Sequence, residues 1–355
     1  MPHSAPNLRH AWLAGIMKAV SYQTTGPSSV LEVVECAEPH AGPGEVRVRI
    51  RVSGVNPTDW KSRSGGGRAN RLAVPHVPNQ DGAGVVDEVG IGVTEFAIGD
   101  RVWVWDAAYQ RPNGTAQELV VLPARQVVAL PDDVDFDEGA SLGIPALTAH
   151  RALTASQFGP SELSPNALDG RIVLVAGGAG AVGHAAIQLA VWAGATVLTT
   201  VSSPAKAALA RAAGAHHVVD YRAEDAATAI RALAPHGVDI VVEVNPSANI
   251  GLDVEVAAHD ATVSIYADGA GDLIMPVRPS MAKNLHFQFV LTYTTPPQVK
   301  DAAVRAVRAA VADGALPVGE AAGLPITRFS LAETGAAHDA VEGGIVGKVL
   351  VDVAS

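Results

Sequence analysis

The pattern of apolar and polar positions changes about 145 residues into the chain. Before that point, short apolar runs alternate with polar residues and are separated by Gly, Pro and Asp turns. Residues 45–52 alternate strictly, which predicts a strand with one polar face. Residues 85–89 and 101–105 predict similar strands. The region from Met17 to about residue 130 is therefore expected to be mostly β.

From Pro145 onward, strand patterns alternate with helix patterns. Apolar runs such as 238–242 are typical of a parallel sheet that is buried on both faces. Six strands joined by crossovers predict an α/β fold with a doubly wound sheet. Strands are expected at 171–176, 196–201, 217–220, 238–243, 261–266 and 285–292, and helices at 182–193, 204–213, 223–234 and 276–283.

The end of the chain is expected to return to the β-rich part. An alanine-rich segment at 299–312 predicts a helix, and 348–353 is strand-like. Because Met17 opens a strand pattern, residues 1–16 are interpreted as an N-terminal extension.

Composition narrows the class of protein. A chain of 355 residues is long for one core, so two domains are expected. The net charge of −11 argues against a nucleic-acid partner, whose binding needs a cationic face. The single cysteine, Cys36, excludes an intrachain disulfide and a Cys-rich zinc site, and favours a cytoplasmic location. Neither a signal peptide nor a membrane span is expected.

A glycine-rich turn carries the clearest chemical signal. Gly178, Gly180 and Gly183 have G-x-G-x-x-G spacing between an apolar strand and a predicted helix. The first glycine is expected to permit the tight turn, the second the approach of a pyrophosphate, and the third close packing of helix on strand. Free N–H groups and the helix dipole would hold the anion. A structural turn without a ligand is the alternative.

The end of the next strand distinguishes the two nicotinamide coenzymes. An NAD site usually places a carboxylate there, whereas 196–201 runs into Ser202, Ser203 and Lys206. A hydroxyl and an ammonium suit a 2′-phosphate, which a carboxylate would repel. Either serine could instead be a plain helix N-cap before Pro204. The absence of an acidic residue favours NADPH.

Several short segments follow one another in an order that is more specific than any one of them. They lie at 54–61, 82–90, 99–102, 143–149, 279–283 and 347–349. Together with the glycine turn, this series resembles the medium-chain dehydrogenase/reductase superfamily. Within it, the chain is similar to the zinc-free NADPH:quinone oxidoreductases of the zeta-crystallin type, from Met17 to about Val353.

The resemblance implies a mostly-β GroES-like catalytic domain and a doubly wound Rossmann domain with a six-stranded parallel sheet. The GroES-like domain would be discontinuous, with residues 17–143 and 295–355. The Rossmann domain, at 144–294, would bind NADPH. A homodimer is also implied, in which the apolar segment 285–291 would pair edge to edge with its copy; an ordinary edge strand is the alternative.

The resemblance also implies a set of site residues. Asn56 would face the nicotinamide and the substrate, and either solvent or Lys61 would supply a proton. Lys61 stands where such quinone reductases often carry Tyr. Residues expected around the cofactor are Thr148, Ala179, Gly180, Ala181, Val182, Ser202, Lys206, Tyr221, Asn249, Tyr266, Ala267, Asp268, Gly269, Val290, Leu291 and Thr292.

The chain departs from the zinc alcohol dehydrogenases of the same superfamily. Their early ligand Cys is replaced within 54–56 and their later G-H-E segment within 80–84, and the four-Cys lobe is missing. We therefore expect no metal site.

The predicted activity is hydride transfer from NADPH to a quinone or a similar conjugated carbonyl compound. The alternatives are an enoyl or enone reductase of a biosynthetic pathway, a non-catalytic NADPH-binding protein and a zinc alcohol dehydrogenase.

Overall fold

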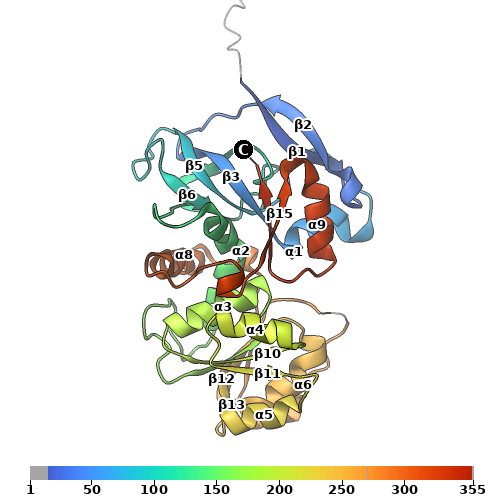
Figure 1. Ribbon diagram of the computed structural model, residues 1–355, viewed down its shortest axis with the longest axis vertical. Helices are drawn as coiled ribbons and strands as arrows, with labels where there is room; N and C mark the ends of the chain where they lie inside the picture. Colours follow the sequence, from blue (N-terminus) through green and yellow to red (C-terminus); the bar gives the residue numbers. More distant parts are fainter. Residues whose placement is uncertain (1–14, 270, 354–355) are drawn as a thin grey trace, which may run out of the picture.

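The computed structural model describes residues 15–269 and 271–353. These residues form two lobes, with helices α2 (Phe136–Leu153) and α8 (Pro297–Ala312) lying between them (Figure 1). Strand β1 (Ile16–Thr24) begins one residue before the predicted start at Met17. The rest of the predicted extension, residues 1–14, lies outside the described part of the chain.

The lower lobe in Figure 1 is built on a six-stranded parallel sheet, as the sequence predicts. The strand order is β11-β10-β9-β12-β13-β14. All six strands are parallel, but their order in the sequence reverses between β9 and β12. Ligands of such sheets bind outside the carboxyl ends of the strands near this reversal. The strands are β9 (Ile172–Ala176), β10 (Thr196–Val201), β11 (His217–Asp220), β12 (Val238–Glu243), β13 (Ala257–Ile265) and β14 (His286–Phe289).

Helices connect these strands. Four follow the prediction with small shifts in their ends: α3 (Ala181–Trp192), α4 (Pro204–Ala212), α5 (Ala226–Leu233) and α7 (Val277–Ala282). A further helix, α6 (Pro246–Val256), was not predicted. Its buried side includes the acidic Asp253 as well as Ile250 and Val254, so the apolar periodicity is blurred.

The upper lobe holds a seven-stranded sheet and a three-stranded sheet. In β3 (Glu45–Val55) burial alternates along the strand, which confirms the predicted polar face. On that face Arg47 and Arg49 both donate to Asp87 of β5 (Asp81–Val89). The other strands of the larger sheet are β6 (Arg101–Val104), β7 (Leu119–Pro123), β8 (Val127–Ala129), β15 (Ile326–Ser330) and β16 (Lys348–Asp352). The smaller sheet contains β1, β2 (Glu32–Ala37) and β4 (Arg71–His76).

The end of the chain returns to this lobe. Strand β16 pairs antiparallel with β3, with Val349 opposite Val55. Helix α9 (Thr334–Glu342), which was not predicted, packs against α1 (Pro57–Ser64). Arg63 of α1, whose side chain is buried, donates to Glu342 of α9 over 2.8 Å. Helices α1 and α9, which are far apart in sequence, therefore pack together in this lobe.

Helix α2 joins the two lobes through one hydrophobic core. This core includes Trp103 of the upper lobe, Leu147 of α2 and Ile240 of the lower lobe. Because α2 is buried on nearly every side, it has no polar face and no helical period, and the sequence did not predict it. The predicted domain limit at 143/144 falls inside this helix, and the limits of the domains stay a prediction.

Candidate functional site

The glycine-rich turn between β9 and α3 fits closely against the sheet. A Cβ added to Gly178 would lie 2.2 Å from the Thr199 hydroxyl, so this residue is needed for packing. The positive φ of the turn, +69°, belongs to Gly177. The expectation that Gly178 permits the tight turn was therefore wrong by one residue, because only Gly177 adopts the left-handed conformation.

Gly183 packs closely, as predicted, and Gly180 has open space where a pyrophosphate is predicted to approach. A Cβ on Gly183 would lie 2.5 Å from the Gly177 carbonyl, so only glycine allows α3 to pack so closely. A Cβ on Gly180 would meet nothing nearer than that same carbonyl, at 3.6 Å. Gly180 is the N-cap of α3, which begins with Ala181 and Val182. An open backbone at a helix N-terminus fits a pyrophosphate group.

A pocket of about 220 Å³, called here the phosphate pocket, opens at this turn. Its walls come from the carboxyl ends of β9, β10 and β11, the edge at which such sheets bind ligands. Five predicted cofactor residues line it: Ala179, Gly180, Ser202, Lys206 and Tyr221. The structure therefore brings these five predicted residues together around one pocket.

The cationic end of the phosphate pocket is well defined. The Lys206 ammonium donates to the Ser202 hydroxyl over 3.2 Å. Ser203 is the N-cap of α4, since its hydroxyl accepts from the Lys206 backbone N–H over 3.3 Å. The capping interpretation thus holds for Ser203, which leaves Ser202 and Lys206 facing the pocket. Tyr221 is 52% exposed and lies beside them.

One wall of the phosphate pocket was missed by the sequence analysis. Gly344, Ile345 and Val346, from the turn before β16, complete the lining. This turn reaches the glycine-rich loop through a bridge between Gly347 and Gly180. The segment 347–349 was recognised as a marker, but its side-by-side placement with residue 180 has no local signal in the sequence.

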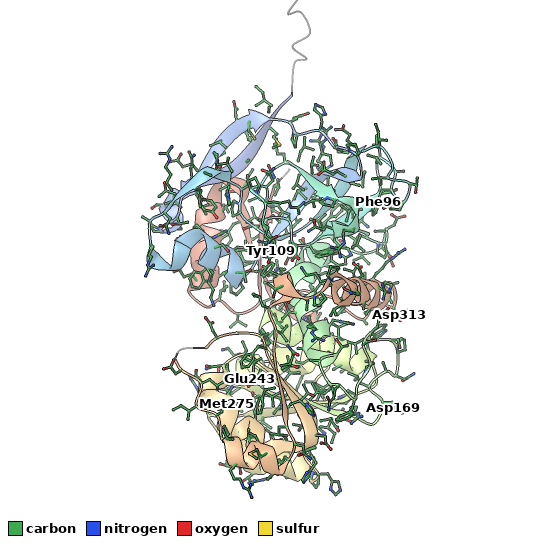
Figure 2. All side chains as sticks on the ribbon, turned by 180° about the vertical axis from the view of Figure 1, so that it is seen from behind. Phe96, Tyr109, Asp169, Glu243, Met275 and Asp313 are labelled. Atoms are coloured by element: carbon green, nitrogen blue, oxygen red, sulfur yellow. The ribbon has the colours of Figure 1, made fainter. Side chains whose placement is uncertain are left out.

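A second pocket, of about 430 Å³, lies between the lobes and is called here the acceptor pocket. Tyr109, which lines it, is seen in Figure 2 where the upper lobe approaches the lower one. The predicted residues Lys61 and Leu291 contribute to it. Its other residues include Thr58, Gln80 and Tyr293, which the sequence analysis did not single out.

Lys61 links the two lobes at the rim of the acceptor pocket. Its ammonium lies 3.1 Å from a carboxylate oxygen of Asp268, which belongs to the predicted cofactor turn. Both side chains are well exposed, at 47% and 82%. An exposed pair of this kind contributes little to stability and separates easily.

Asn56 lies in a buried polar network rather than on an open surface. Its amide donates to Asp81 over 2.7 Å, and its carbonyl oxygen accepts from Lys348 over 2.8 Å. Asp81 also accepts from the Ile144 backbone N–H of α2. The side chain of Asn56 is thus fixed in orientation, with one of its two amide hydrogens engaged.

The charges of this network are shifted by burial. Burial raises the pKa of Asp81, against the nearby Lys348 ammonium, and lowers the pKa of Lys348. Asp59, one turn into α1, accepts from the Asn56 backbone N–H over 2.7 Å. Burial raises the pKa of Asp59 to about 8. Burial thus favours the protonated form of Asp59 in the first turn of α1.

Four predicted cofactor residues lie where α2 meets the segment after β14. The hydroxyls of Thr148 and Thr292 are hydrogen-bonded to each other, and both side chains are buried. Val290, two residues before Thr292, is also buried, whereas Leu291 is 56% exposed. The structure thus brings Thr148 and Thr292 together, and of these four predicted residues only Leu291 lines the acceptor pocket.

Two of the remaining predicted residues, Asn249 and Tyr266, contact Glu243 at the end of β12. Asn249 donates to the Glu243 carboxylate over 3.0 Å, and the Tyr266 backbone N–H donates to the Glu243 carbonyl over 3.1 Å. Burial is the main cause that raises the pKa of Tyr266, and the negative charge of Glu243 raises it further. Ala267, Asp268 and Gly269 follow Tyr266 in the turn after β13, and Gly269 has φ +62°.

Glu243 and Asp253 form an unusual buried acidic pair. Within the described residues, one oxygen of each carboxyl is buried without a hydrogen-bond donor. Burial raises the pKa of both groups, and Glu243 raises that of Asp253 further. A proton held between the two carboxyls would satisfy both oxygens. Figure 2 shows Glu243 in the lower lobe, where the sequence analysis had assigned no role to it.

Residues 15–269 and 271–353 contain no cluster of three or more His, Cys, Asp or Glu able to hold a metal ion. In the same part of the chain, every helix is too short or too polar to span a lipid bilayer.

Comparison with known families assigns the class. Residues 42–132 match the alcohol dehydrogenase GroES-like domain, and 181–309 match the family described as zinc-binding dehydrogenase. With the parallel six-stranded sheet, these matches define a medium-chain dehydrogenase/reductase and confirm the predicted fold class.

Individual relatives narrow the assignment. The quinone oxidoreductase of Rattus norvegicus is 31% identical over 274 residues, 76% of this chain and 78% of the relative. The 2-haloacrylate reductase of a Burkholderia species is 35% identical over 235 residues, 64% of this chain and 66% of that protein. A mycobacterial protein solved in complex with NADPH has a TM-score of 0.76 and 28% identity, covering 94% of this chain and 99% of that one. The chain belongs to the quinone oxidoreductase family of the medium-chain dehydrogenases/reductases, and is an enzyme of that type.

Proposed function

We propose that the protein uses NADPH to reduce a quinone or a similarly conjugated carbonyl compound without a metal ion. The observation that carries the proposal is the position of the phosphate pocket and the acceptor pocket. Lys206 and Ser202 mark one end of the carboxyl edge of the parallel sheet, and Leu291 marks the other. A dinucleotide laid along this edge would reach from one pocket to the other.

The residues at this edge fit NADPH. Gly180 leaves room for the pyrophosphate, and Lys206 with Ser202 offers an ammonium and a hydroxyl to a 2′-phosphate. Tyr221 would lie against the same group. When bound, NADPH supplies the hydride. The complex of the mycobacterial relative with NADPH supports this choice.

The predicted contacts of the adenosine and nicotinamide ends stay part of the proposal. Asn249 and Tyr266 are held by Glu243, and Thr148 and Thr292 by each other. These residues would therefore act mainly as a preformed wall. The contact of Asn56 with the acceptor stays a proposal, because this side chain is 2% exposed and is not among the residues that line the acceptor pocket. Either solvent or Lys61, at the rim, supplies the proton that completes the reduction.

A reaction without metal is supported by the chemistry of the acceptor. A quinone or enone is already electrophilic through its conjugation, so it needs only orientation and a proton source. At the positions of the zinc ligands in related dehydrogenases, this chain has the segments 54–56 and 80–84, which contain no Cys or His.

The experiment is a coenzyme-oxidation assay with protein dialysed against a chelator. NADPH oxidation is followed with a panel of quinones and enones, and the products are identified. The proposal predicts turnover with quinones that zinc does not enhance. It is overturned by turnover that requires added zinc, or by NADPH binding without turnover of any acceptor, which would favour a non-catalytic binding protein.

An enone or enoyl reductase is the second candidate. The 35% identity to a 2-haloacrylate reductase is the observation that favours it. Product analysis separates the two, because alkene reduction gives a saturated carbonyl compound and quinone reduction gives a hydroquinone or semiquinone.

The cellular setting and assembly are proposed as follows. A single cysteine favours the cytoplasm. β14 is an edge strand of the parallel sheet, with Phe289 65% exposed, and would pair with its copy in a homodimer. Light scattering on Phe289→Lys tests this: the variant should be monomeric where the parent is dimeric, and an unchanged mass contradicts this interface.

A further inference from the structure

Two stacked tyrosines form one wall of the acceptor pocket. The rings of Tyr109 and Tyr293 lie 5.0 Å apart between centroids, with an angle of 26° between their planes. Both residues line the pocket. Tyr109 follows β6 in the upper lobe, and Tyr293 follows β14, the edge strand of the lower sheet. The wall is therefore assembled from two distant parts of the chain.

A hydroxyl pair fixes the outer end of Tyr293. Its phenol oxygen lies 2.7 Å from the Thr58 hydroxyl at the start of α1. Burial raises the pKa of Tyr293 well above its usual value, so the phenol stays neutral and the hydrogen bond persists. This contact fixes the phenol end of Tyr293, but it does not hold the backbone of that residue.

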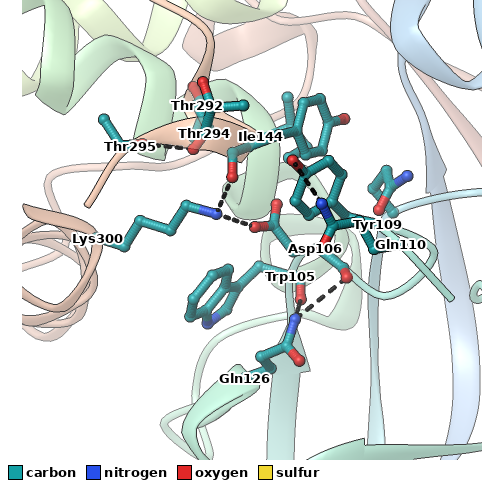
Figure 3. Close-up of polar contacts among 12 residues, drawn as sticks. Trp105, Asp106, Tyr109, Gln110, Gln126, Ile144, Thr292, Thr294, Thr295 and Lys300 are labelled. Carbon is teal, nitrogen blue, oxygen red and sulfur yellow. Dashed lines mark hydrogen bonds and ion pairs between the residues drawn. The ribbon is translucent and has the colours of Figure 1, made fainter. Parts of the chain in front are cut away.

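A buried lysine holds the other end. Lys300 of α8 is 8% exposed, and its ammonium donates to the Tyr293 carbonyl over 2.8 Å. The same ammonium forms an ion pair with Asp106, close to Tyr109 (Figure 3). It also lies 5.5 Å from the Tyr109 ring centroid and 5.6 Å from that of Trp105, within the range of cation–π attraction. One charge thus contacts both sides of the wall.

Helix stability does not explain this lysine. Lys300 is the fourth residue of α8, where the positive end of the helix dipole disfavours a cation. A buried ion pair is often no more stabilising than an apolar pair of the same size. Its contacts point to the tyrosines instead.

We propose that Lys300 is a positioning residue that holds Tyr109 and Tyr293 as a flat aromatic wall, and that this wall selects acceptors with an extended planar ring. The inference rests on the proposed function, because it concerns the acceptor of that reaction. A planar ring would stack on the tyrosine face that lines the pocket, whereas a small enone without a ring gains little there.

The test uses two kinds of variant. Tyr109→Leu removes the wall directly. The double variant Lys300→Met with Asp106→Asn removes the ion pair while leaving no buried charge unpaired. Asp106 has φ +52°, which asparagine tolerates. Arg308→Met is the matched control, because it removes an exposed cation from the same helix. Thermal unfolding of each variant checks that it folds.

The readout is the ratio of kcat/KM for 2-methyl-1,4-naphthoquinone to that for 3-buten-2-one. Both test variants should lower the ratio by about tenfold, mainly through a higher KM for the naphthoquinone, since stacking contributes an effect of this order. The control should leave the ratio unchanged. An unchanged ratio in Tyr109→Leu overturns the wall, and an unchanged ratio in the double variant alone overturns the role of Lys300.

Failure of the proposed function gives a different result. If the parent protein oxidises NADPH with neither acceptor, calorimetry with 1-naphthol and cyclohexanol tests the wall without turnover. The wall predicts tighter binding of 1-naphthol in the parent and loss of that preference in both test variants. Equal binding of the two alcohols by the parent overturns the inference.

Discussion

Replacing Lys206 with alanine should weaken the binding of NADPH much more than that of NADH. The Lys206 ammonium lines the phosphate pocket and is held by Ser202 at 3.2 Å. A hydrogen bond between a charged donor and a phosphate contributes about 1.5–3 kcal/mol. Because Lys206 is half-buried and therefore partly screened, the lower end applies. The affinity for NADPH should fall about tenfold, since about 1.4 kcal/mol corresponds to that factor.

The variant should fold like the parent, because the contact that caps α4 uses the backbone N–H of residue 206 and not its side chain. Isothermal titration calorimetry with both coenzymes, at low and high salt, measures the effect. Arg211→Ala is the control, since it removes an exposed cation from the last turn of the same helix. Equal losses for NADPH and NADH, or an equal loss in the control, would refute the assignment of the 2′-phosphate to Lys206.

Two further predictions concern stability. Asp59 has a pKa of about 8 in the folded chain against 3.8 for an ordinary aspartate, so its contribution is complete below about pH 4 and is lost as the pH rises to about 8. Asp59→Asn should reduce the fall in unfolding free energy over this range by up to about 1.4 kcal/mol per pH unit. Urea unfolding of the parent and the variant at pH 5 and pH 8 measures this difference. The same pH dependence in both proteins would contradict the prediction. Gly183→Ala should destabilise the protein by about 1–3 kcal/mol, because its Cβ would lie 2.5 Å from a backbone carbonyl. Gly251→Ala, an exposed position in α6 with open space around it, should be neutral or slightly stabilising; equal melting temperatures for the two variants would count against the packing argument.

The sequence predicted the elements whose signals are local. The central strand β9 has a continuous apolar run bounded by turns, and all six parallel strands lie within a few residues of their predicted positions. Five residues that line the phosphate pocket were predicted because they lie in the glycine turn or in the short segments after β10 and β11. These parts of the site depend on neighbours along the chain.

The missing parts depend on contacts between distant segments. Helix α2 lacks a polar face because both lobes cover it, and α6 buries Asp253 against Glu243. Asn56 was predicted to face a ligand, but nothing near it indicated that Asp81 and Lys348 would bind its amide. Likewise, Lys300 reads as an ordinary polar residue at the start of a helix, and only the structure brings it to Tyr109 and Tyr293.

The most direct test of the central claim, reduction of an organic acceptor by NADPH without a metal ion, is a single-turnover experiment on chelator-treated protein. Protein loaded with NADPH, either protiated or deuterated at C4 of the nicotinamide, is mixed rapidly with a quinone. The account predicts oxidation of the coenzyme in the metal-free protein and a slower rate with the deuterated form. Oxidation that begins only when zinc is restored, or no oxidation at all, would contradict it.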